Sequence, residues 1–138
     1  MTDDLGTRIA ARALSHIGVT FRLHGRNVES GFDCVGLIVD ALESVGFSAD
    51  VPIIYSLRGR FEAQASAFFD RAQFAVIGTG EGAHHGDIYL VKVAANQLHF
   101  LIHIGAGFVH AHAGLRRVVV TPGPVPWPVV GQWRYIGD

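Results

Sequence analysis

Cys34, the single cysteine of the chain, lies where a glycine-rich loop leads into an apolar helix, so its thiol is a candidate nucleophile. Asp33 is a favoured N-cap residue, and we expect Cys34 in the first helical turn behind it. Unpaired N–H groups at a helix start carry partial positive charge and favour the reactive thiolate. Such a thiol should alkylate well below the ordinary cysteine pKa of about 8.5. The alternative is a small buried apolar residue, the commoner fate of a free cysteine.

Histidines could supply the proton acceptor that a thiol nucleophile needs. The chain has eight, and four of them lie in the predicted strands of its C-terminal part: His99, His103, His110 and His112. Period-two alternation puts His99 and His103 on one face of a predicted strand, and His110 and His112 on one face of the next. The glycine turn at 105–107 makes these strands neighbours, so we expect His99 and His110 to lie close together. That pair could act as a base and its orienting partner.

The elements that position these groups are predicted to be helices first and strands afterwards. Helical spacing predicts three apolar stripes: Ile9, Ala10, Ala13, Leu14 and Ile17, capped by Asp4 or Thr7 and ended by Gly18; Leu37, Ile38, Ala41, Leu42 and Val45, ended by Gly46; and Phe61, Ala65, Phe68, Phe69 and Ala72. Short β-branched and aromatic runs predict strands over 88–94, 98–104, 108–112, 118–121 and 129–136. Residues 18–31 and 51–56 are predicted polar loops. The order predicts an α+β fold with the cysteine helix packed on an antiparallel sheet.

Length, charge and composition exclude several classes of protein. The chain has 138 residues, which fits one domain over residues 1–138, and a lone cysteine forms no internal disulfide. The formal net charge of −1 gives no field that would hold nucleic acid or anionic lipid. Charged residues and histidines interrupt the apolar runs before they reach membrane-spanning length. The acidic start lacks a secretion signal, so we expect synthesis in the cytoplasm.

Four motifs, in their order along the chain, resemble the NlpC/p60 family of papain-like cysteine peptidases. They are Gly18-Val19-Thr20-Phe21-Arg22, Asp33-Cys34-Val35-Gly36-Leu37, Gly86-Asp87-Ile88 and Val109-His110-Ala111, the last preceded by a histidine strand. The resemblance spans nearly the whole chain and implies a papain-like fold without a cofactor or metal. It implies Cys34 as the nucleophile, His99 as the base and His110 as the orienting residue. It also implies peptidoglycan stem peptides as substrate, cut between γ-D-glutamate and a diamino acid.

Substrate-binding and oxyanion residues are expected close to the nucleophile. The backbone N–H of Cys34 can hold the oxyanion, while Asp33 either caps the helix or contacts a substrate amine. The family usually has a tyrosine where this chain has Phe21, so a hydroxyl is missing, and His24 is the nearest substitute.

The choice of base depends on the spacing between histidines. Phe100 and Leu101 follow His99, where the family usually has a small residue and a glycine. The interval from His103 to His110 is too short for the family pattern, so we assign His99 as the base.

The segment Phe21-Arg22-Leu23-His24-Gly25-Arg26 is similar to small peptidases of phage tails and gene transfer agents. This similarity implies a chain associated with a virion or tail particle, acting in the periplasm, with tail-tip proteins as partners. Trp127, in the proline-rich segment 122–128, is the candidate docking residue. The alternative is that Trp127 packs on its own sheet in a rigid loop.

Three other functions stay open at the level of sequence. The four histidines of the sheet half could bind a metal ion, although structural zinc sites usually include cysteines. Phe21 and Phe100 favour a catalytically inactive tail structural or binding protein. An acyltransferase or amidase could use the same scaffold, because both activities, like a cysteine peptidase, proceed through an acyl-enzyme. We expect the adjacent pair His84-His85 to be solvated in a polar turn.

Overall fold

Three helices and eight strands form the computed structural model, which describes residues 4–48, 61–78, 80–95 and 97–137. In chain order they are α1 (Leu5–Leu14), β1 (Arg26–Asn27), β2 (Gly31–Phe32), α2 (Cys34–Glu43), α3 (Phe61–Phe69), β3 (Phe74–Val76), β4 (Ile88–Ala94), β5 (Gln97–His103), β6 (Gly107–His112), β7 (Arg117–Pro122) and β8 (Val129–Tyr135). The predicted α+β order is confirmed. The predicted loop at 51–56 lies outside the described residues.

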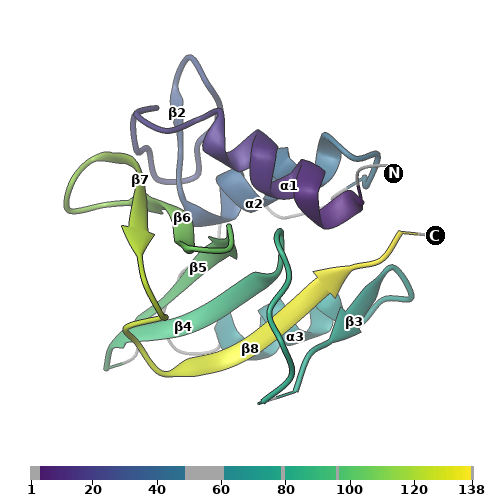
Figure 1. Cartoon of the computed structure of the whole chain (residues 1–138). Coiled ribbons are helices and arrows are strands. Elements are labelled where there is room, and N and C mark those ends of the chain that lie inside the picture. Colours follow the sequence, from purple (N-terminus) through teal and green to yellow (C-terminus); the bar gives the residue numbers. More distant parts are fainter. Residues whose placement is uncertain (1–3, 49–60, 79, 96, 138) are drawn as a thin grey trace.

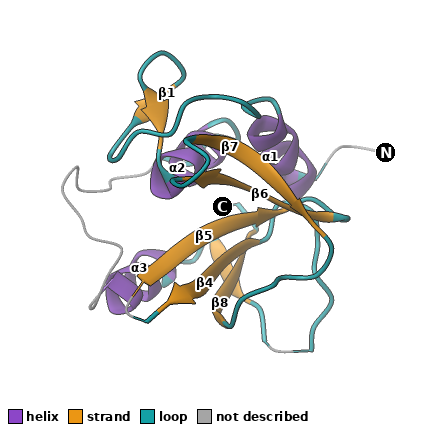
Figure 2. Ribbon diagram, turned by 90° about the vertical axis from the view of Figure 1, so that its left-hand side faces the viewer, coloured by secondary structure: helices purple, strands orange, loops and turns teal. Residues whose placement is uncertain are grey.

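Six strands form one antiparallel sheet in the order β3-β8-β4-β5-β6-β7 (Figure 1). Helices α1 and α2 pack against each other and against β5 and β6, whereas α3 packs against β8 (Figure 2). The helix that begins at the cysteine is therefore seated on the two strands that carry the histidines. No helix in the described part of the chain has the length and apolar character needed to cross a membrane.

Both faces of the central strands are buried. One face of β4 and β5 joins the buried side chains of the helices in the main core: Ile88, Leu90, Leu98, Phe100 and Ile102. The opposite face forms a second cluster with β6: Tyr89, Val91, Leu101 and Phe108, flanked by Val93, Val125 and Trp127. Side chains of a strand point alternately to its two faces, so adjacent residues of one strand serve different clusters. This packing makes β4 and β5 a firm base for the site.

Strands β5 and β6 pair at one end and separate at the other. Their ladder pairs Ile102 with Val109 and His103 with Phe108, and it continues no further among the described residues. His99 and His110 lie beyond these pairs, and α2 packs against both strands. The two histidine positions are therefore not paired in the ladder, although Cys34, His99 and His110 line one cavity.

The helices and strands differ from the predictions mainly at their ends. Helix α1 begins at the predicted cap Asp4, but it ends at Leu14, and Leu14 and Ile17 are 37% and 51% exposed. The stripe of α2 is confirmed, with Val45 only partly buried. Helix α3 ends at Phe69, before Ala72.

Two regions contain strands that the pattern did not predict. Strand β3 has three residues, too few to show a periodic pattern. The predicted loop at 18–31 contains β1 and part of β2, joined in a hairpin. Bridges from Thr20 to Arg117 and from Phe21 to Phe32 attach this segment to its neighbours.

Candidate active site

Cys34 is the first residue of α2, and Asp33 fixes its position. The fully buried carboxylate of Asp33 accepts a hydrogen bond from the N–H of Gly36 at 2.8 Å, which confirms the predicted N-cap. Its other oxygen accepts from the N–H of His24 at 2.8 Å. A Cβ at Gly36 would overlap the carbonyl oxygen of Gly25, so the loop backbone lies directly on the first helical turn. The cap and this contact together hold the loop and the nucleophile turn as one unit.

The thiol of Cys34 is buried, with 1% of the residue exposed. Burial, together with a smaller contribution from the negative charge of Asp33, raises the pKa of the thiol to about 12. Backbone hydrogen bonds from Phe100 and from the helix start lower the pKa by less. The predicted preference for the thiolate is therefore wrong for this structure, because desolvation outweighs the partial charge of the helix terminus.

His99 and His110 form a hydrogen-bonded pair, as their strand positions predicted. Nε2 of His99 lies 2.8 Å from Nδ1 of His110, and the rings meet edge to face with centroids 4.9 Å apart. Nε2 of His110 lies 2.7 Å from Oγ1 of Thr121 on β7. The Nδ1 atom of His99 is the ring nitrogen that remains for the thiol. Sequence reasoning missed Thr121, although its place on a strand next to a histidine strand was the available signal.

Both imidazoles are held in the neutral form. Burial, with a smaller electrostatic contribution from His110 and His112, lowers the pKa of His99 to about 3. Burial also lowers the pKa of His110 to about 4, with a contribution from His112. A neutral thiol therefore lies in the same site as two neutral rings. In this arrangement a proton can move from sulfur to nitrogen as the sulfur attacks, rather than before.

One cavity of about 200 Å³ brings these groups together. Its lining is Phe21, Cys34, Val93, Gln97, Leu98, His99, His110, Ala111, His112, Ala113, Gly114 and Trp127. This lining contains the three predicted catalytic residues and none of the four charged residue types Asp, Glu, Lys and Arg. Phe21, which stands where the family usually has a tyrosine, lies in this lining, as predicted for a residue of the substrate site.

Trp127 forms part of the cavity wall. Its ring lies 6.5 Å from that of His99 and 6.1 Å from that of His110, measured between centroids. It also packs beside the second cluster on its own sheet. Packing on its own sheet is the alternative that the sequence analysis gave to a docking role for Trp127. In this position the side chain is only partly exposed.

The other predicted site residues lie outside the cavity lining. Nδ1 of His103 lies 3.2 Å from the carbonyl oxygen of His84, and His103 does not line the cavity that contains Cys34. His24 bonds Asp33 through its backbone, and Asp33 itself is enclosed. The side chains of His84 and His85 are exposed, as expected for a solvated turn.

The sequence left open a metal site formed by the histidines of the sheet, and the described residues contain no cluster of that kind. Among those residues, no group of three or more histidine, cysteine, aspartate or glutamate side chains is arranged to hold an ion. Nδ1 of His112 accepts from the N–H of Leu115 at 3.0 Å, and both nitrogens of His110 have partners.

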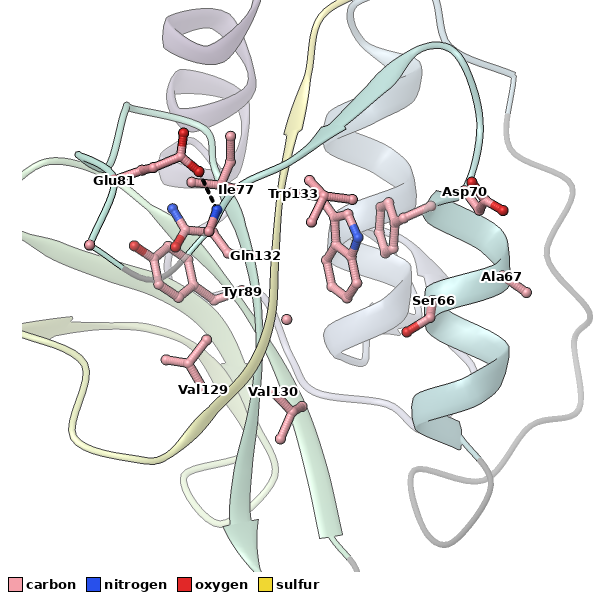
Figure 3. Close-up of a pocket in the computed structure, with 15 residues that line it drawn as sticks. Ser66, Ala67, Asp70, Ile77, Glu81, Tyr89, Val129, Val130, Gln132 and Trp133 are labelled. Carbon is pink, nitrogen blue, oxygen red and sulfur yellow. Dashed lines mark hydrogen bonds between the residues drawn. The ribbon is translucent and has the colours of Figure 1, made fainter.

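A second cavity, of about 760 Å³, lies between α3, β8 and the segment after β3 (Figure 3). Ser66, Ala67 and Asp70 line its helix side, and Ile77, Glu81, Tyr89 and Gln132 line the opposite side. Its described lining includes no cysteine and no histidine. The described lining of the larger cavity therefore lacks a thiol and an imidazole, and the smaller cavity, which has both, is the candidate active site.

Comparisons with known proteins identify the class of fold. No family model matches the sequence, and no curated protein matches it. Solved structures of NlpC/p60 proteins do match, at 18–23% sequence identity. The fold is thus the NlpC/p60 fold that the sequence motifs implied.

Individual structures show how far the likeness extends. NlpC1 from Trichomonas vaginalis is 19% identical, with a TM-score of 0.75 over 98% of this chain and 45% of that one. The peptidoglycan hydrolase RipB from Mycobacterium tuberculosis is 18% identical, with a TM-score of 0.65 over 97% and 65%. A p60 domain from Mycobacterium avium subspecies paratuberculosis is 18% identical, with a TM-score of 0.66 over 97% and 96%. This chain spans about half the length of the two Trichomonas proteins.

Proposed function

We propose that this chain is a cysteine peptidase of the NlpC/p60 type that hydrolyses peptidoglycan stem peptides. Cys34 is the nucleophile, His99 the general base and His110 the residue that orients it. Residues 1–138 act as one catalytic domain. The hydrogen bond between Nε2 of His99 and Nδ1 of His110 is the observation that carries the proposal, because it leaves Nδ1 of His99 for the thiol that lines the same cavity.

The groups of the site account for both halves of an acyl transfer. Nδ1 of His99 takes the thiol proton while Sγ of Cys34 forms a bond to the substrate carbonyl carbon. The backbone N–H of Cys34 donates to the oxyanion, a contribution of about 3 kcal/mol for one such donor. The C–N bond then breaks, and the proton passes from His99 to the leaving amine. His99 then takes a proton from water as the water oxygen bonds to the acyl carbon, the C–S bond breaks to release the acid, and the proton returns from His99 to sulfur.

The neutral ground state fits this sequence of steps. Substrate that enters the cavity expels water from it. Because Cys34 and His99 are neutral before the reaction, this step does not require the desolvation of a thiolate–imidazolium ion pair. Charge develops on sulfur only as the carbonyl carbon is attacked, and His99 receives the proton at that moment. Its partner His110 then faces an imidazolium and stabilises it through the 2.8 Å contact.

The substrate class rests on the fold neighbours and on the family resemblance. The matched RipB structure is described as a peptidoglycan hydrolase. The proposed scissile bond joins γ-D-glutamate to a diamino acid, as the motif resemblance implies.

Delivery by a virion or tail particle to the periplasm belongs to the same proposal, and it rests on the motif at Phe21 to Arg26. Recovery of the chain with purified particles and tail-tip proteins would test that part.

Purified muropeptides test the proposed reaction. Incubation with a γ-linked stem peptide in heavy-oxygen water should give two fragments, with one heavy oxygen in the new D-glutamate carboxyl group. The matched substrate is the α-linked isomer, which should stay intact. Products joined to an added amine, without heavy oxygen, would instead indicate an acyltransferase. Intact γ-linked peptide under all conditions would favour the inactive binding protein.

A further inference from the structure

Strand β7 supplies a polar contact that the proposed triad does not use. Oγ1 of Thr121 lies 2.7 Å from Nε2 of His110, whose Nδ1 lies 2.8 Å from Nε2 of His99. His110 is 1% exposed, and Thr121 is partly buried. Both nitrogens of this enclosed ring therefore have a partner. The contacts form a continuous line from a hydroxyl on β7 to the imidazole that shares a cavity with Cys34.

Proton positions along this line are coupled. A neutral imidazole has one N–H and one lone pair, so each ring donates at one end and accepts at the other. If His99 is to accept a proton at Nδ1, its own proton must be on Nε2 and be donated to Nδ1 of His110. Then His110 must carry its proton on Nε2, and the oxygen of Thr121 must accept it. The opposite arrangement would put a proton on Nδ1 of His99 and block it as a base.

We propose that Thr121 is a positioning residue that holds His110 in its Nε2–H tautomer and thereby keeps Nδ1 of His99 unprotonated. The inference rests on the proposed roles of Cys34 and His99. It extends the Cys-His-His set by one hydroxyl group that touches neither the substrate nor the thiol.

The sheet register explains why residue 121 can do this. The β6–β7 ladder pairs Phe108 with Thr121 and His110 with Val119. Thr121 is thus the diagonal neighbour of His110, two residues along β7 on the same face, within reach of a histidine side chain. Threonine is branched at Cβ and its χ1 angle is restricted, so the strand holds the hydroxyl in place.

Histidine tautomers can be observed without any substrate. Two-bond proton–nitrogen correlations on protein labelled at histidine nitrogen distinguish protonated from unprotonated ring atoms, and His110→Gln assigns the signals. We expect His110 to have a protonated Nε2 and an unprotonated Nδ1. Thr121→Val, which keeps the shape and removes the hydroxyl, should give a mixture of tautomers, and Thr121→Ser should restore one. A protonated Nδ1 in the native chain, or unchanged signals in Thr121→Val, would overturn the proposal.

Turnover of the γ-linked stem peptide gives the second readout. Thr121→Val should lower kcat roughly tenfold and leave KM nearly unchanged, because one hydrogen bond is lost and the substrate contacts are not. Thr121→Ser should recover most of the rate. Native kcat in Thr121→Val would reject the positioning role and leave the peptidase assignment intact. A native chain with the expected tautomer but no hydrolysis would reject the peptidase assignment and leave the role of Thr121 in ordering the histidine pair.

Discussion

His99 and His103 share one strand, but of the two only His99 lines the cavity with Cys34. The ring of His103 is instead directed to the carbonyl oxygen of His84. His99→Ala should therefore abolish hydrolysis of stem peptides, as expected for loss of a general base. His103→Ala is the matched change and should lower kcat less than tenfold. Steady-state kinetics on both variants checks this, and an equal collapse in His103→Ala would reverse the assignment of the base.

The state of the thiol is a second property of single residues. Because burial raises the pKa of Cys34 to about 12, alkylation by iodoacetamide should be slow at neutral pH and should rise steadily through pH 10. The same thiol in urea is the reference and should follow an ordinary pKa of about 8.5. Mass spectrometry gives both rates. A fast reaction that is already constant near pH 6 would demonstrate a thiolate–imidazolium pair and contradict the neutral ground state.

At the scale of elements, the start of α2 depends on how closely the preceding loop approaches it. Gly36→Ala should destabilise the fold by about 1–3 kcal/mol, although alanine is the better helix former, because its Cβ would overlap the carbonyl of Gly25. Gly82→Ala, with open space around it, should change stability by less than about 0.5 kcal/mol. Urea unfolding measures both changes. Equal stability of the two variants would show that the loop yields easily and does not fix the nucleophile turn.

The sequence predicted those elements whose pattern is long enough to be read. The cysteine helix and its cap at Asp33 follow from apolar spacing and N-cap chemistry, and the strands of the sheet agree with alternation to within one or two residues. The three-residue β3 and the hairpin of β1 and β2 carry too few residues for a period. The exposure of Ile17 depends on α1 ending early, which apolar spacing does not reveal.

The candidate site could be predicted only where it depends on local patterns in the sequence. Strand neighbours can be deduced from a short turn, so the contact of His99 with His110 was accessible. The neutral thiol was not, because the partial charge of a helix start is local and readable, whereas burial depends on how distant segments close over the sulfur. Thr121 and Trp127 enter the site from segments with no chemical motif of their own.

For the molecule as a whole, the histidine pair links stability to pH. The unfolded chain protonates His99 near pH 6.5, whereas the folded chain resists protonation until about pH 3. Lowering the pH between these values therefore favours unfolding, by about 3 kcal/mol at pH 4 from His99 alone. Urea unfolding from pH 7 to pH 4 should show this loss, and His99→Gln should show less of it. A native chain equally stable at both values would mean that the site accepts charge readily.

Replacement of the thiol tests the central claim most directly. Cys34→Ser changes one atom at the start of α2 and should leave the circular dichroism spectrum and thermal unfolding nearly unchanged, and Cys34→Ala provides a second variant without a buried hydroxyl. Mass analysis of γ-linked stem peptides should find cleavage by the native chain and none by either variant. Measurable turnover by folded Cys34→Ala would show that Cys34 is not the nucleophile and would contradict the proposed mechanism.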